Sequence, residues 1–276
     1  MIQDIFPKKL SNSYKPEAVA SENSLIIVHE QGQLLLDLNE DTKNLAYPML
    51  KDFKETSTPI YMFSIDDEDF FYVTDYQLKE DRFQLYNMKQ LRSWYLSPQH
   101  YVFAAFTALQ LAEWYETTKY CGKCGHENIH SNKERAMVCP HCGNIIYPRI
   151  NPAVIVGVIN GDKILLTKYR TGFAHYALIA GFTEIGETME ETVQREVMEE
   201  AGIKVKNIRY YKSQPWGIAS DILLGYYCEV DGDDTIKMDS SELKFAEWVN
   251  REDVVLQPLE YSLTNEMMTN FKEGRI

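Results

Sequence analysis

The 276-residue chain is predicted to combine an α/β domain with a β-rich domain and a small zinc-binding module. Three observations predict this fold class. Residues 1–96 contain short strand-like segments, two Cys-x2-Cys pairs lie between residues 120 and 146, and a glutamate-rich helical pattern follows between apolar strands. We therefore expect a β-rich domain at 1–96, a connecting helix at 97–119, a zinc ribbon at 120–146 and an α/β domain at 147–276.

The N-terminal region has four segments of strand-like composition separated by turn residues, at 24–30, 33–38, 59–65 and 69–74. The acidic stretch at 65–69 is interpreted as a polar hairpin turn. No catalytic arrangement of residues is visible here. The apolar pattern at 97–119 then predicts a helix that leads into the cysteine-containing segment.

Composition limits the function classes. Hydrophobic residues make up 45% of the chain and aromatic residues 12%, which is enough for packed cores. No apolar run of 18 residues and no N-terminal apolar segment of the secretory type occur, so we expect no membrane insertion and a cytoplasmic location. Cys228 lies in an apolar run and is interpreted as a buried free thiol.

The two cysteine pairs have the spacing of a zinc site. Tight turns, each closed by a glycine (Gly125, Gly143), would let four thiolates converge on one Zn²⁺ and leave no ligand position open, which predicts a structural metal. Two disulfides are the alternative, and an intracellular-looking chain disfavours them. Three nearby histidines are interpreted as bystanders. The predicted zinc ligands are Cys121, Cys124, Cys139 and Cys142.

Zinc ribbons also bind nucleic acids, which requires a basic surface if the binding is independent of sequence. The ribbon contains Lys123, Lys133 and Arg135 but also Glu127 and Glu134, and the whole chain has a net charge of −13. Generic binding to a phosphate backbone is therefore disfavoured.

Strands are expected at 147–159, 163–168 and 221–230, with a final helix near 261–272. Between them, Thr188 and Glu191 form a capping-box signature, and Gly202 suits a helix end, so a helix is predicted at 189–201. Strands on both sides of a central helix indicate an α/β core rather than a helical bundle.

Three glutamates of this helix, Glu196, Glu199 and Glu200, share one face because they stand at i, i+3 and i+4. A solvated charged face would lie opposite the apolar arc that contains Val193 and Val197. These carboxylates instead lie at its edge or within it, where they are costly unless a cation compensates them. Hard oxygen ligands in this number suit Mg²⁺ or Mn²⁺ shared with substrate phosphates.

The segment from Gly181 to Ile203 resembles the Nudix box, Gly-x5-Glu-x7-Arg-Glu-U-x-Glu-Glu-x-Gly-U, where U is aliphatic. The resemblance implies an α/β/α sandwich with a mixed sheet, and hydrolysis of a nucleoside diphosphate linked to another moiety. It implies metal ligation by Glu196 and Glu200, with Glu199 as a ligand or general base. Glu187 and Arg195 would support the site.

Three further motifs narrow the resemblance. Tyr147-Pro148-Arg149 follows the ribbon, Ala180-Gly181-Phe182 opens the box, and Ser213-Gln214-Pro215-Trp216 comes after it. Taken singly, these aromatic residues would more often belong to a core than stack on a ligand. With the ribbon directly ahead, they resemble the NADH pyrophosphatase subfamily of Nudix hydrolases.

This second resemblance implies the reaction NAD(H) + H₂O → NMN(H) + AMP, with removal of NAD caps from RNA as a secondary activity, in a homodimer. It implies more than one catalytic Mg²⁺ or Mn²⁺ and one structural Zn²⁺ per chain. Tyr147 and Phe182 would sandwich a base beside Ile155, and Glu242 would add to the metal site. The remaining implied substrate-binding residues are Ser213, Gln214, Trp216 and Thr264, partly supplied by the second subunit.

The chain departs from the subfamily pattern after Trp216. Gly217, Ile218 and Ala219 stand where the subfamily has Pro-Phe-Pro, and the proline-rich segment expected near Thr264 is missing. These changes remove an aromatic ring and backbone constraints, so we expect a looser pocket. Two alternatives stay open: hydrolysis of ADP-ribose or dinucleoside polyphosphates, and a non-catalytic nucleotide sensor. The intact acidic residues of the box argue against the sensor.

Overall fold

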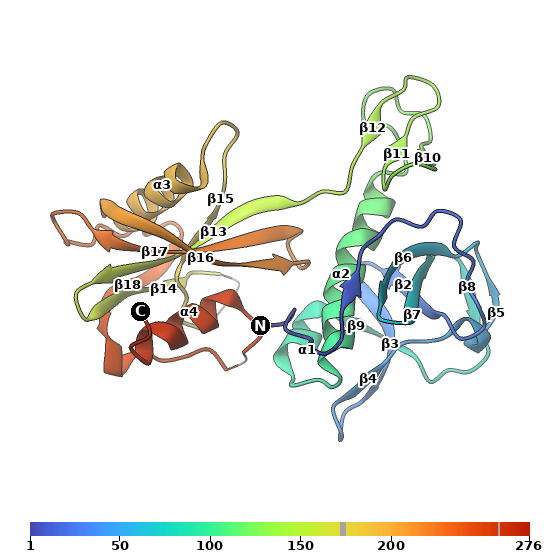
Figure 1. Cartoon of the computed structure of the whole chain (residues 1–276), viewed down its shortest axis with the longest axis horizontal. Helices are drawn as coiled ribbons and strands as arrows, with labels where there is room; N and C mark the ends of the chain where they lie inside the picture. The colour runs from blue at the N-terminus through green and yellow to red at the C-terminus, as the bar shows by residue number, and fades with distance from the viewer. Residues whose placement is uncertain (172–174, 259) are drawn as a thin grey trace. The chain divides into compact units, whose positions relative to one another are not determined.

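The computed structural model describes residues 1–171, 175–258 and 260–276, and the chain forms two compact units (Figure 1). The N-terminal unit contains residues 2–149 and 217–220. The C-terminal unit contains residue 1 with residues 150–216 and 221–276. The finer division at residues 96, 119 and 146 stays a prediction.

The N-terminal unit is built on a seven-stranded sheet in the order β1-β6-β7-β2-β3-β4, with β9 paired to β3. β2 and β7 are parallel, and the other pairs are antiparallel. The four strand-like segments correspond to β2, β3, β6 and β7, and Asp66 and Asp67 form the predicted turn. The elements are β1 (Leu10–Ser11), β2 (Leu25–Glu30), β3 (Gln33–Asn39), β4 (Asn44–Ala46), η1 (Leu50–Asp52), β5 (Phe53–Thr56), β6 (Ile60–Ile65), β7 (Glu68–Val73), β8 (Tyr76–Leu78), β9 (Gln84–Asn87) and α1 (Met88–Ser93).

Helix α2 (Gln99–Thr117) is the predicted connecting helix, shortened at its start because Pro98 is its N-cap. Glu116 ties the end of α2 to the sheet. Its carboxylate accepts hydrogen bonds from His29 Nδ1 at 2.8 Å and from the Tyr72 hydroxyl at 2.9 Å. His29 Nε2 accepts from the Gly32 N–H at 3.0 Å, which fixes the proton on Nδ1. The ribbon that follows α2 contains three two-residue strands, β10 (Ile129–His130), β11 (Met137–Val138) and β12 (Ile145–Ile146).

The C-terminal unit has a six-stranded mixed sheet in the order β16-β17-β13-β14-β18, with β15 also paired to β13. β13 and β17 are parallel, and the other pairs are antiparallel. Its elements are β13 (Asn151–Asn160), β14 (Lys163–Tyr169), β15 (Ile179–Phe182), α3 (Met189–Ala201), β16 (Val205–Trp216), β17 (Asp221–Val230), β18 (Leu243–Asn250), η2 (Arg251–Asp253) and α4 (Leu263–Lys272).

Alternate residues of β13 supply two separate cores. Val154 and Val156 pack with Val193 and Val197 of α3, whereas Ile155 packs in the cluster that contains the apolar side chains of α4. Because neighbouring strand residues point to opposite faces, α3 and α4 cover opposite sides of the sheet (Figure 1). This is the expected α/β/α sandwich. Among the described helices, none is long and apolar enough to span a membrane.

Candidate metal centres and active site

The four predicted zinc ligands of the ribbon converge. Their sulfur atoms all lie within 4.8 Å of one another, with 3.7 Å between Cys121 and Cys142, 3.5 Å between Cys124 and Cys139, and 3.4 Å between Cys124 and Cys142. Thiolates at about 2.3 Å from a tetrahedral zinc would be separated by about 3.8 Å, whereas a disulfide brings sulfurs to about 2.05 Å. The cysteines are therefore free thiols with the spacing of a four-cysteine zinc site.

Two matching turns hold these cysteines. The N–H groups of Gly125 and Gly143 donate to the carbonyls of Cys121 and Cys139, at 2.8 and 2.9 Å, and both glycines have φ near +70°. This left-handed backbone favours glycine. Burial opposes ionisation of Cys121, but backbone N–H groups that point at its sulfur lower its pKa to about 6. Backbone N–H groups likewise lower the pKa of Cys139, whereas burial and the neighbouring cysteines raise the pKa of Cys124 to about 12. The turns thus favour the metal-binding thiolate form at Cys121 and Cys139.

Helix α3 has the predicted bounds and both predicted caps. The Thr188 hydroxyl accepts from the Glu191 N–H at 3.2 Å, and the Glu191 carboxylate accepts from the Thr188 N–H at 2.7 Å. Gly202 ends the helix with φ at +68°. The apolar arc fixes the rotation of the helix, because Val193 and Val197 are fully buried. That rotation brings Glu196 against Gly181 of β15.

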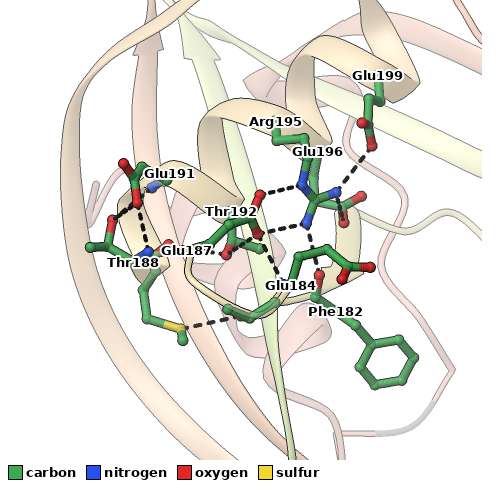
Figure 2. Close-up of polar contacts among 11 residues, drawn as sticks. Phe182, Glu184, Glu187, Thr188, Glu191, Thr192, Arg195, Glu196 and Glu199 are labelled. Atoms are coloured by element: carbon green, nitrogen blue, oxygen red, sulfur yellow. Dashed lines mark hydrogen bonds and ion pairs between the residues drawn. The ribbon is translucent and has the colours of Figure 1, made fainter.

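Arg195 is the hub of the cluster, as Figure 2 shows. Its guanidinium donates to both oxygens of Glu187, at 2.5 Å and 2.9 Å, and to Glu196 and Glu199 at 2.6 Å and 3.0 Å. It also donates to the carbonyl of Phe182 at 2.9 Å. The hydrogen bonds from Arg195 are the main reason that the pKa of Glu187 falls to about 2. Arg195 therefore fixes Glu187 as an anion and connects the helix to the end of β15.

The first glycine of the box, Gly181, is required for steric reasons. A Cβ atom at Gly181 would overlap the carboxylate of Glu196. The Glu196 side chain is only 12% exposed, and burial is the main cause that raises its pKa. Gly181 therefore leaves the space in which Glu196 lies flat against β15.

Glu200 is the most buried carboxylate of the cluster, with 3% of the residue exposed. Burial, followed by the charges of Glu196 and Glu242, raises its pKa to about 8 despite hydrogen bonds from the Tyr169 hydroxyl and the Ala180 N–H. The charge of Glu242 also raises the pKa of Glu196. Glu242, just before β18, is thus close enough to interact with two glutamates of α3.

The carboxylates approach one another less closely than the thiolates do. In the described parts of the chain, three or more ligand atoms within 4.8 Å of one another occur at the four cysteines and at Cys124, His126 and His141, not at the glutamates. Like charges repel, and Arg195 draws Glu199 and Glu196 toward itself. The side chain of Glu199 is 59% exposed.

The residues that the family resemblance implies to bind substrate lie on different elements and differ in their exposure. Phe182, at the end of β15, is 52% exposed, whereas Ile155 is buried in the core on the α4 side. Tyr147 belongs to the N-terminal unit, is 54% exposed, and donates from its hydroxyl to Glu134 at 3.0 Å. Ser213 lies in β16, where it pairs with Leu224 of β17.

Gln214 has an unexpected position. It is fully buried, and its amide donates to the Tyr261 carbonyl and accepts from the Leu263 N–H, both at 2.7 Å. It therefore fixes the start of α4, whose first turn contains Thr264. Trp216 is partly buried against the core on the same side of the sheet.

The sequence analysis did not identify Tyr169 as part of the site, because nothing in the local sequence pattern signals its contact with Glu200.

Comparisons with known proteins agree with this geometry. A model of the NUDIX domain matches residues 149–271, and a model of the NADH pyrophosphatase zinc ribbon domain matches residues 116–147. Over 153 residues the chain is 46% identical to proteins named NAD-capped RNA hydrolase NudC from Escherichia coli O9:H4 (strain HS) and Escherichia fergusonii. Each match covers 54% of this chain and 58% of the relative, so the chain spans little more than half of these relatives.

A solved structure supports the fold. The crystal structure of a NUDIX hydrolase from Nitrosomonas europaea superimposes with a TM-score of 0.50 at 22% sequence identity, covering 57% of this chain and 92% of that one. The sandwich, the box and both domain matches lead to one conclusion. The chain contains a Nudix domain at residues 149–271, preceded at residues 116–147 by a zinc ribbon of the NADH pyrophosphatase kind.

Proposed function

We propose that this protein hydrolyses the pyrophosphate bond of NAD(H) to give NMN(H) and AMP at the carboxylate cluster of α3. One observation carries the proposal: Arg195 donates both to the cluster and to the carbonyl of Phe182, whose ring is exposed. A surface for stacking a base is thus attached to the group that orients the carboxylates. The identity to NAD-capped RNA hydrolases supports the same substrate class.

The donor set fits Mg²⁺ or Mn²⁺. Glu196, Glu199, Glu200 and Glu242 offer hard oxygen ligands. Burial, followed by the charges of neighbouring glutamates, raises the pKa values of Glu196 and Glu200, so a bound cation would favour their ionised forms. When bound, such cations would neutralise the pyrophosphate and lower the pKa of the attacking water. We propose more than one of them at this site, and one structural Zn²⁺ at the four cysteines.

The residues of the chain have separate tasks in this proposal. Arg195 holds Glu187 and Glu196 in fixed orientations, so these carboxylates need no reorganisation when substrate binds. Glu199 is exposed and can rotate from Arg195 toward a cation or an attacking water, as a ligand or general base. Phe182 stacks on a base of the dinucleotide, and we propose Tyr147 and Ile155 as further substrate-binding residues.

The Ser213–Trp216 segment supports the pocket from β16. Because the buried Gln214 holds the backbone at 261–263, we propose that it orders the start of α4 and thereby Thr264, while Ser213 and Trp216 line the pocket. A homodimer would complete this pocket from the second subunit. Light scattering of the purified protein tests the dimer, and a monomeric mass would contradict it. A cytoplasmic location belongs to the same proposal.

One experiment compares the possible functions. Purified protein with Mg²⁺ is incubated with NADH, NAD⁺, ADP-ribose and diadenosine polyphosphates, and the products are separated by chromatography. NMNH and AMP from NADH as the fastest reaction would support the proposal. Faster cleavage of ADP-ribose or a diadenosine compound, which the Gly217–Ala219 departure favours, would replace it. No turnover with any metal would favour a nucleotide sensor.

Removal of NAD caps from RNA is a secondary proposal. The same pyrophosphate bond would be cut, and the relatives of this chain are named for that activity. The net charge of −13 disfavours strong binding of an RNA backbone. We therefore expect a short NAD-capped RNA to be cleaved with a lower kcat/KM than NADH. Equal or faster cleavage of the RNA would contradict this order.

A further inference from the structure

Tyr169 is the last residue of β14 and points to the α3 side of the sheet. The strand alternation that puts Leu165 in the core beneath α3 gives Tyr169 the same direction. The pairing of β14 with β18 shifts register between Lys168 and Tyr169, so that Tyr169 pairs with Leu243. The irregularity thus places Tyr169 opposite Leu243, the residue that follows Glu242. Such irregularities often re-aim a side chain at a functional site.

The hydroxyl of Tyr169 lies between Glu200 and the backbone of β15. It is 3.3 Å and 3.5 Å from the two carboxylate oxygens of Glu200 and 3.5 Å from the Ala180 carbonyl oxygen. The Ala180 N–H also donates to Glu200. Two donors from different strands therefore contact the most buried carboxylate of the cluster, and together they limit its side-chain rotation.

We propose that Tyr169 is a positioning residue, whose hydroxyl holds the Glu200 carboxylate in the orientation that a divalent cation requires. The inference rests on the proposed metal-dependent function of the α3 cluster. Groups that orient metal ligands typically change metal affinity by about 10- to 100-fold when removed. Because the hydrogen bonds of Tyr169 are long, we expect an effect near the lower limit of that range.

The test is Tyr169→Phe in the full-length, zinc-loaded protein, which keeps the ring and removes only the hydroxyl. Mn²⁺ binding without substrate is measured by electron paramagnetic resonance of the free ion. We expect the Kd for Mn²⁺ to rise about 10-fold with an unchanged melting temperature. In the matched control Tyr226→Phe, which changes a buried tyrosine of the same core, the Kd should stay the same.

A second readout separates positioning from damage to the fold. Raising the Mn²⁺ concentration should restore most of the kcat of Tyr169→Phe toward NADH, because the defect lies in metal binding. A Kd equal to that of the wild type would overturn the inference and leave the proposed function intact. Wild-type protein that binds no Mn²⁺, or binds it equally well after Glu200→Gln, would overturn the inference together with the metal site of the proposed function.

Discussion

The cysteine cluster of the ribbon and the carboxylate cluster of α3 are built in opposite ways. The four sulfurs already lie within 4.8 Å of one another, held by turns whose N–H groups favour the thiolate form at Cys121 and Cys139. The carboxylates are held apart, with Glu199 turned to Arg195 and Glu200 held by Tyr169. The first cluster can surround one metal completely, and the second cannot do so without further ligands.

This difference separates a structural from a catalytic site. A saturated tetrahedral site has no position left for a substrate, whereas a catalytic site keeps open positions. The α3 cluster holds its carboxylates through Arg195, Tyr169 and the backbone of β15. In the proposed function, phosphate oxygens of the substrate would complete the metal coordination. A structural site can thus be recognised by how closely its ligands converge. A catalytic site can be recognised by the residues that orient its ligands.

The largest expected effect concerns the ribbon. Cys121→Ala should reduce bound zinc from about one ion per chain to almost none, because structural zinc sites contribute about 10–16 kcal/mol of binding free energy in small domains. The measurement is zinc content by mass spectrometry, with melting temperature as a second readout. Cys228→Ala, which changes the buried thiol of the Nudix domain, should keep its zinc. Full zinc content in Cys121→Ala would refute the four-cysteine site.

Glu200→Gln should lower kcat toward NADH by about 10³-fold, since a metal ligand contributes several kcal/mol of transition-state stabilisation. Zinc content and melting temperature should not fall. The matched control is Glu190→Gln, an exposed glutamate in the first turn of the same helix, which should keep normal turnover. If Glu200→Gln retained most of its activity, the catalytic site would lie elsewhere.

Arg195→Lys should lower kcat by about 10- to 100-fold. Lysine keeps the positive charge but cannot donate to both oxygens of Glu187 while also reaching Glu196 and the Phe182 carbonyl. Steady-state kinetics with NADH at saturating Mg²⁺ measures the effect. Wild-type kcat in this variant would mean that charge alone, and not the geometry of the guanidinium, organises the cluster.

Gly181→Ala is expected to have the smallest effect, about a 10-fold loss of kcat. The added methyl group would overlap the Glu196 carboxylate, which can rotate away at the cost of its orientation. In the double variant Gly181→Ala with Glu196→Asp, the shorter side chain should remove the overlap, so the two changes should not act additively. Strict additivity would contradict a direct contact between these residues.

Local signals made α3 predictable to the residue, because its capping box, its terminal glycine and its apolar arc are all encoded within 189–202. The cysteine spacing likewise predicted the ribbon. The strand expected from residue 147 begins only at Asn151, where the pairing with Asp221 of β17 starts. Short local patterns therefore predicted the existence of each element better than the residues at which it begins and ends.

The missed parts of the site depend on tertiary contacts. Tyr169 meets Glu200 because the folded sheet places the end of β14 beneath α3, and no spacing in the sequence encodes that contact. The position of Glu242 was implied by family resemblance and could not be reached from composition or periodicity. The role of Gln214 could not be predicted for the same reason, because its burial against the start of α4 depends on how β16 packs against α4.

The central claim is that catalysis belongs to the carboxylates of α3 and that zinc has a structural role. The most direct test is NADH cleavage by protein that retains one zinc per chain but has been stripped of other divalent ions. We predict no turnover until Mg²⁺ or Mn²⁺ is added, then formation of NMNH and AMP with unchanged zinc content. Turnover by the zinc-only protein, unaffected by added Mg²⁺, would contradict the account.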